Sequence, residues 1–134
     1  VLTAIGLYYA GSQMKQARNL ASGEFLLRIE ELLKQHEDVH TKLRPGGAWS
    51  GEKGPESTEE WVAVEQYMGL FQRIYELIKM GSINIEQVDD FYGYRVLNIT
   101  RNPVIKNAKL NNDNENKYWA RFIYLWEEIV KRRG

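Results

Sequence analysis

The stretch STEEWVAVEQYMGLFQRIYELIKM, residues 57–80, decides the fold class. Apolar side chains recur in it at spacings of three and four, which places them on one side of a helix. They form two adjacent stripes: Trp61, Val64, Met68, Phe71, Tyr75 and Ile78 in the first, and Tyr67, Leu70, Ile74 and Leu77 in the second. Because two stripes cover close to half of the helix circumference, the sequence predicts a central helix, over 58–80, that lies between partners.

The ends of this helix are marked by short-range signals. Ser57 and Glu60 stand at the spacing of a capping box, in which each side chain bonds the backbone N–H of the other residue. Gly81 suits the left-handed conformation that commonly follows the end of a helix. We therefore expect the helix to end just before Gly81.

Length, charge and cysteine content limit the possible classes of protein. A chain of 134 residues is the size of one domain. Its 18 basic and 18 acidic side chains leave no net charge, so it lacks the basic surface of a nucleic-acid binder, and we expect no nucleic-acid partner. The absence of cysteine excludes a disulfide framework and a thiolate zinc site, and it fits a reducing compartment such as the cytoplasm.

The first ten residues, VLTAIGLYYA, are almost wholly apolar. A bilayer span needs about 20 such residues, so this segment is too short to cross alone. Tyr8 and Tyr9 occupy the place of interfacial aromatics, and Lys15 and Arg18 follow, as is typical of a cytoplasmic flank. We favour the inner end of a membrane helix over 1–19; the alternative is that these residues are the first turns of a core helix.

Residues 12–43 contain no proline and are rich in good helix formers, so we predict one unbroken helix over 1–43. Such a helix is about 65 Å long and must project beyond the bundle of residues 20–134. A projecting apolar end needs a membrane or another subunit to cover it, and we expect a homo-oligomer through this helix. The candidate partner or membrane contacts are Leu2, Ile5, Leu7, Tyr8 and Tyr9, together with Trp49 from the next segment.

Residues 44–57 hold two prolines and four glycines and predict a flexible loop. Trp49, in its middle, is either an anchor that packs back on the bundle, which we favour, or an exposed contact for a partner.

Three further helices are predicted, at 84–101, 103–110 and 116–132. Asn84 and Gln87 form a second capping-box pair, and Pro103 suits a first helical position. In the first of these helices Arg95 falls on the inward stripe of Val88, Phe91, Tyr92 and Ile99, where it needs an acidic partner such as Glu65 or Glu76. No stretch is typical of a strand. The sequence thus predicts an all-α antiparallel bundle of four main helices and one short helix.

The segments LIKMGSI at 77–83, VDDFYGYR at 88–95 and KYW at 117–119, with the apolar N-terminus, resemble a family of uncharacterised bacterial proteins. Members of that family have an N-terminal membrane segment and a cytoplasmic all-helical domain. The resemblance implies architecture and membrane attachment, and no activity.

The pentapeptide His36-Glu37-Asp38-Val39-His40 matches His-Glu-x-x-His. On a helix both imidazoles share a face and can bind one Zn²⁺, while Glu37 activates a bound water. A catalytic site needs a third ligand, and the candidates are Glu59, Glu60 and Glu65. We favour an ordinary helix end with no metal and no cofactor; a catalytic zinc site and a structural or adventitious metal site are the alternatives.

Asp89 and Asp90 are the other candidate pair for chemistry. Adjacent carboxylates point about 100° apart on a helix, so they do not face one another as an acid and a base. We interpret them as acids that stabilise a helix N-terminus, with Gly93 allowing close helix packing. The sequence contains no phosphate loop, dinucleotide fingerprint or serine hydrolase pattern.

These observations predict a non-enzymatic helical domain that is tethered to the cytoplasmic face of a bacterial inner membrane and binds a partner or self-assembles. One alternative is a membrane-acting effector or sensor, for example in bacterial defence, whose ligand would lie near Trp49. Another is a zinc-dependent hydrolase that uses His36, Glu37 and His40. The alternative location is the cytoplasm, with the protein in soluble form.

Overall fold

The computed structural model describes residues 4–134, and over that range the chain is all-α, with six α-helices and no strand. The helices are α1 (Ala4–Lys34), α2 (Glu37–Leu43), α3 (Thr58–Lys79), α4 (Ile85–Arg101), α5 (Pro103–Ile105) and α6 (Ala120–Arg133). A π-helical turn, Lys106–Leu110, continues α5, and a 3₁₀ turn, Asn116–Trp119, leads into α6. The all-α prediction is therefore confirmed. We call residues 37–134, from α2 to α6, the head.

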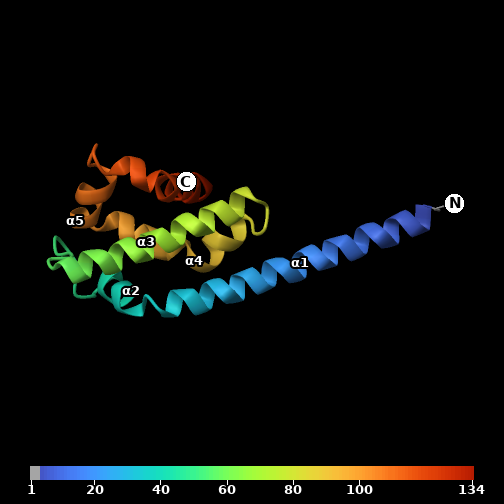
Figure 1. Ribbon diagram of the computed structural model, residues 1–134, viewed down its shortest axis with the longest axis horizontal. Coiled ribbons are helices and arrows are strands. Elements are labelled where there is room, and N and C mark those ends of the chain that lie inside the picture. The colour runs from blue at the N-terminus through green and yellow to red at the C-terminus, as the bar shows by residue number, and fades with distance from the viewer. Residues whose placement is uncertain (1–3) are drawn as a thin grey trace.

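Helix α3 is the centre of the head. Figure 1 shows it between α2 on one side and α6 on the other, and it contacts α1, α2 and α6. Both predicted stripes contribute to the core, with Val64, Tyr67, Met68, Leu70, Phe71 and Ile74 buried. The two stripes are needed because α3 is covered from more than one direction.

The predicted helix ends are confirmed at α3 and α4. The Ser57 hydroxyl accepts from the Glu60 backbone N–H at 3.1 Å, and the Glu60 carboxylate accepts from the Ser57 N–H at 3.2 Å. Asn84 and Gln87 make the same reciprocal pair at the start of α4. Gly81, with φ of +79°, follows α3 in the left-handed region. These caps depend on residues within four positions of each other, which is why the sequence reveals them.

The prediction of one unbroken helix over 1–43 is wrong. Gln35 and His36 interrupt it: their N–H groups bond the carbonyls of Leu32 and Leu33, three residues back, and His36 has φ of −117° and ψ of 20°. The break turns α2 so that Val39 and Leu43 are buried, and α2 packs against α3 and α4. No proline or glycine marks this position, so long-range packing rather than local propensity ends α1.

Helix α1 extends well beyond the head. The Ser22 hydroxyl donates to the Ser82 carbonyl at 2.8 Å, and Ile29 and Leu33 are buried farther along the helix. On the N-terminal side of Ser22, α1 leaves the head, as Figure 1 shows. At 1.5 Å per residue, the part before Leu20 is about 24 Å long.

The long loop after α2 is restrained by the head. Trp49 is 6 % exposed, and the Asn102 amide donates to the carbonyls of Trp49, at 3.2 Å, and Lys53, at 2.8 Å. Gly54 lies so close to Val104 that an added Cβ would be 2.6 Å from the Val104 Cβ. Trp49 is thus an anchor, as favoured from the sequence, and offers little surface as a partner contact. Three contacts restrain a loop whose glycines and prolines led us to expect flexibility.

Helix α4 departs from its predicted inward stripe at one position. Val88, Tyr92 and Ile99 are buried as expected, but Phe91 is 57 % exposed. The face of α4 that packs into the core is centred on Val88, Tyr92, Val96 and Ile99. The Phe91 ring therefore lies outside the core.

Candidate functional site

The two histidines lie at the break between α1 and α2 and contact different helices. The His36 ring packs against Tyr67 of α3, with centroids 5.5 Å apart, whereas the His40 ring makes an edge contact with Tyr94 of α4 at 5.8 Å. His36 is the residue before α2 and has non-helical backbone angles, so the two rings point to different neighbours although the His40 N–H still bonds the His36 carbonyl. The imidazoles thus pack where the start of α2 meets α3 and α4.

Glu37 is engaged in an ion pair. Arg95 donates from Nη2 to the Glu37 carboxylate at 3.1 Å and from Nη1 to the Tyr67 hydroxyl at 3.3 Å. The prediction that Arg95 pairs with Glu65 or Glu76 is wrong, because those carboxylates bind other cations. Lys109, 8 % exposed, donates to Glu65 at 2.8 Å, and Arg121 pairs with Glu76.

The electrostatics of this cluster favour neutral imidazoles. Burial, followed by the charges of Arg73 and Arg95, lowers the pKa of His36. Burial and the charge of Arg95 likewise lower the pKa of His40, against the opposing effect of Glu37. Burial raises the pKa of Tyr67 to about 12, so its hydroxyl stays protonated and accepts from Arg95.

These residues do not fit a catalytic zinc site. Over residues 4–134 no group of three or more His, Asp or Glu side chains is placed to hold a metal ion. Two of the three proposed third ligands are committed elsewhere, Glu60 to the cap of α3 and Glu65 to Lys109. A general base also has to be free to take a proton from water, whereas Glu37 is paired with Arg95. We derive no hydrolytic step from this motif.

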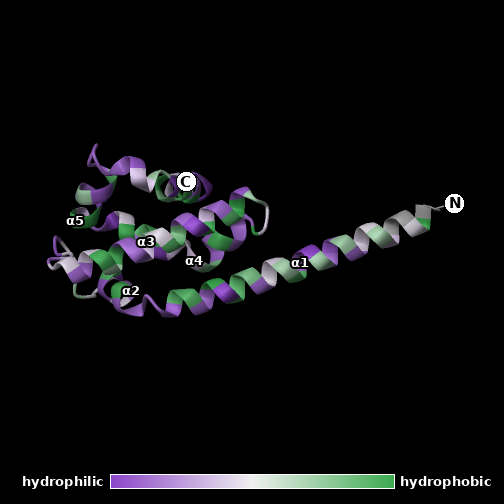
Figure 2. Ribbon diagram, viewed as in Figure 1, coloured by the Kyte–Doolittle hydropathy of each residue, from purple (hydrophilic) through white to green (hydrophobic). Residues whose placement is uncertain are grey.

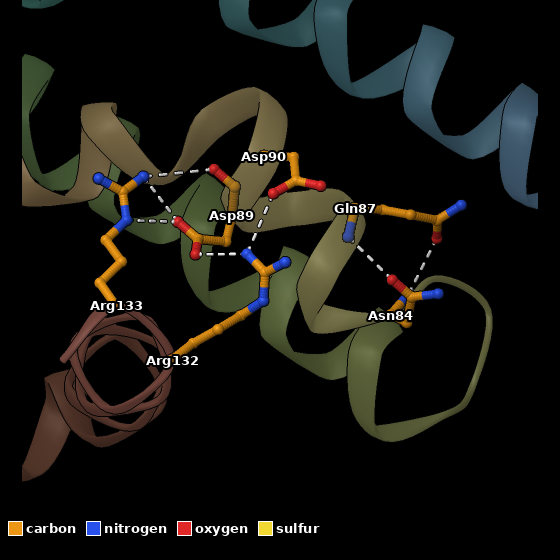
Figure 3. A network of polar contacts seen from close by, with 6 residues as sticks. All are labelled: Asn84, Gln87, Asp89, Asp90, Arg132 and Arg133. Atoms are coloured by element: carbon orange, nitrogen blue, oxygen red, sulfur yellow. Dashed lines mark hydrogen bonds and ion pairs between the residues drawn. The ribbon is translucent and has the colours of Figure 1, made fainter.

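The acidic pair of α4 has a role that the sequence analysis missed. Asp89 is 2 % exposed and accepts from Arg132, at 2.7 Å, and from Nε of Arg133, at 2.9 Å, both at the end of α6. Asp90 accepts from the same Arg132 at 3.0 Å, and Figure 3 shows both guanidinium groups reaching α4 from α6. The interpretation of the pair as first-turn acids is wrong for Asp89, which is buried within α4 and ties α6 to it. Its partners lie more than 40 residues away, so no local signal reveals them.

Burial alone would raise the pKa of Asp89, but the hydrogen bonds from Arg133 and Arg132 hold it below its usual range. Gly93, one turn later on α4, leaves room for this arrangement: an added Cβ would lie 2.0 Å from Oδ1 of Asp89 and 2.7 Å from Nη2 of Arg133. Gly93 thus serves close packing, as expected, but of an ion-pair network. This network is structural, because all its charges are paired with one another.

The predicted contact residues of α1 divide into two groups. Ile5 and Tyr9 are 81 % and 64 % exposed. The structure does not describe the side chains of Leu7 and Tyr8, and Leu2 lies outside the described residues. Within residues 4–134 no helix combines the length and the apolar character that a bilayer crossing needs.

Comparisons with protein-family models, with curated proteins and with solved structures gave no match. The resemblance to a family of uncharacterised bacterial proteins therefore stays a prediction. Any functional proposal has to depend on the chain's own geometry.

Proposed function

We propose that the protein is a non-enzymatic interaction domain, in which an antiparallel bundle, the head, carries α1 as an arm for self-association. One observation carries the proposal: α1 extends beyond the head, and large apolar side chains are exposed along it. No set of catalytic side chains in the described residues competes with this reading, because the histidine and aspartate clusters are used in packing and in ion pairs.

The exposed apolar residues of α1 are ordered around the helix. At 100° per residue, Ile5, Tyr9, Leu20 and Leu27 fall within about 60° of one another, and we call them the outer stripe. Each is at least 64 % exposed. Ile29 and Leu33, which pack on the head, lie about 135° away around the helix. The outer stripe therefore faces away from the head, where a second molecule can approach.

The part of the outer stripe from Ile5 to Leu20 has no charge on its side of the arm, whereas Glu24 lies beside the stripe between Leu20 and Leu27. Between Ile5 and Leu20 the charged residues are Lys15 and Arg18, and at helical spacing both fall on the side of the buried residues rather than on the outer stripe. Figure 2 shows white and green shades along the outward end of α1, with purple bands beginning nearer the head. An uncharged surface of this kind suits a second copy of itself, since pairing two such arms desolvates no charge.

The area of the outer stripe sets the expected affinity of self-association. It runs about 33 Å along the helix, and a helix is about 10 Å wide, so one arm offers a footprint of about 330 Å². Stable interfaces bury about 800 Å² on each partner. We therefore expect a weak, concentration-dependent dimer rather than an obligate one.

Light scattering and sedimentation over a concentration series test the proposal. A Leu20→Glu variant places a charge in the outer stripe and is expected to be monomeric throughout. Met14→Glu is the matched control: Met14 is 65 % exposed on the same helix, but on its other side, so association should persist. A chain that starts at Leu20 should be monomeric as well. The proposal fails if the unchanged chain is monomeric at every concentration, or if both variants dissociate equally.

The membrane tether at the cytoplasmic face of a bacterial inner membrane is a second proposal for the same arm. The almost wholly apolar segment at 1–10, followed by Lys15 and Arg18, favours it. Flotation with anionic vesicles tests it: binding that Tyr9→Glu abolishes and Met14→Glu preserves supports a lipid contact through the outer stripe. Absence of flotation, together with a concentration-dependent dimer, leaves self-association alone. The effector or sensor alternative adds to the tether a ligand near Trp49.

A further inference from the structure

The loop after α2 and the last turn of α4 line a shallow cavity that is open to solvent. Its volume is about 220 Å³, and its lining includes Arg44, Gly46, Trp49 and Gly51 from the loop side. Asn98 and Arg101 complete it from α4. This cavity lies apart from the outer stripe, so what it binds is independent of the function proposed for α1.

The charge of this cavity is not compensated. Two arginines line it, and no acidic side chain does. Six other cations of the head have carboxylate partners, whereas Arg73 and five lysines form no ion pair among the described residues. Arg44 and Arg101 also form no ion pair within residues 4–134, and they are the two cations that line this cavity. In a chain with no net charge, two unpaired guanidinium groups beside one cavity create a local positive potential that favours an anion.

The Trp49 side of the cavity is held in place by contacts within the chain. The Trp49 side chain is buried. The Trp49 backbone N–H donates to the Lys42 carbonyl at 2.9 Å, and the Trp49 carbonyl accepts from the Asn102 amide. Gly46 and Gly51 take φ of +82° and +73°, which lets the loop turn on either side of Trp49. A preformed wall reduces the ordering that a ligand would otherwise have to impose.

Three side chains that carry hydrogen-bond donors line the cavity: Arg44, Asn98 and Arg101. The Arg44 and Arg101 guanidinium groups present planar forks that match the oxygens of phosphate or carboxylate. The Asn98 amide makes no hydrogen bond to another side chain or backbone group in the part of the chain that the structure describes. A phosphate monoester carries nearly two negative charges at neutral pH, against one for a carboxylate, and so balances both arginines.

We propose that the cavity between residues 44–51 and the end of α4 binds a phosphate group, with Arg44, Arg101 and Asn98 as its donors. The volume of about 220 Å³ suits the phosphate itself and a small attached group rather than a nucleotide. Two sources share this chemistry, free inorganic phosphate and a small phosphate monoester, and the experiment separates them.

The test follows the Trp49 indole N–H and Asn98 side-chain resonances by NMR while inorganic phosphate or glycerol phosphate is added, with chloride at equal ionic strength as the reference. We expect saturable shifts at these two residues. Arg44→Gln and Arg101→Gln should each weaken binding about tenfold or more, since each removes a charge-assisted hydrogen bond. Tighter binding of glycerol phosphate identifies the monoester as the ligand class, and equal binding identifies the free ion.

Arg28→Gln is the matched control, because Arg28 is exposed, forms no ion pair among the described residues and lies on α1 away from the cavity. It should bind phosphate like the unchanged chain. The proposal is overturned if neither probe shifts the two resonances, if chloride reproduces the shifts, or if Arg28→Gln weakens binding as much as Arg44→Gln. Circular dichroism and the urea midpoint of each variant show that the changes at these exposed arginines leave the fold intact.

Discussion

Gly93 gives the sharpest test of how the head is held together, because two physical effects predict opposite signs for Gly93→Ala. In an exposed helix interior, replacing glycine with alanine stabilises by about 1 kcal/mol through backbone entropy. At Gly93 the new Cβ would lie 2.0 Å from Oδ1 of Asp89, a distance that no relaxed structure tolerates. The Asp89 carboxylate has to move, and its bonds to Arg132 and Arg133 are disturbed.

The magnitude follows from the burial of each partner. Breaking a fully buried ion pair by disturbing one side costs about 3–5 kcal/mol. Here Asp89 is buried, but the side chains of Arg132 and Arg133 are 34 % and 45 % exposed, so solvent reduces the loss. After subtracting the gain of about 1 kcal/mol in helix propensity, we expect Gly93→Ala to lower the free energy of unfolding by about 1–3 kcal/mol.

Urea denaturation monitored by circular dichroism measures this difference, and Gly69→Ala is the matched control. Gly69 lies inside α3, and an added Cβ there would meet Nη1 of Arg73 at an ordinary 3.9 Å. Gly69→Ala should therefore raise the stability by up to about 1 kcal/mol. In an Asp89→Asn background the cost of Gly93→Ala should shrink, since the cycle isolates the coupling between the two positions. A Gly93→Ala variant as stable as the unchanged chain would refute the reasoning.

Three further predictions concern pH and the loop. The arginine partners of Asp89 hold the pKa of this carboxyl below its usual value. The stability that the carboxylate contributes is therefore present above about pH 4 and is lost as the pH falls through the lowered pKa. The urea midpoint of Asp89→Asn should accordingly change less with acid pH than that of the unchanged chain. The pKa values of His36 and His40 are also lowered in the folded chain, so stability is fully present above 6.5 and falls as the pH drops below that value; NMR titration of the two imidazoles checks this, and midpoints at or above 6.5 would contradict it. Trp49→Ala should lower the free energy of unfolding by about 3–5 kcal/mol, because it removes a buried indole that anchors the loop; calorimetry measures it, and a loss below about 1 kcal/mol would show that the loop is not anchored by this side chain.

The sequence by itself determined that α3, α4 and α6 are helices, and it determined several helix ends. The periodicity of residues 57–80 predicted α3 and its two buried stripes, and the pairs Ser57–Glu60 and Asn84–Gln87 predicted caps that the structure contains. Both kinds of signal depend on residues close together in the sequence, so they can be recognised without the tertiary structure. The sequence also predicted that the N-terminal helix projects, because that helix is longer than the helices on which it packs.

Tertiary structure alone decided the break at His36 and the partners of the charged residues. The break carries no proline or glycine and exists because Val39 and Leu43 are buried once α2 turns onto α3 and α4. Arg95 lies 58 residues from Glu37, and Asp89 lies more than 40 residues from its arginines. Which carboxylate meets which cation depends on how the helices are rotated and shifted against one another. That arrangement is fixed by packing over the whole core rather than by neighbours in the sequence.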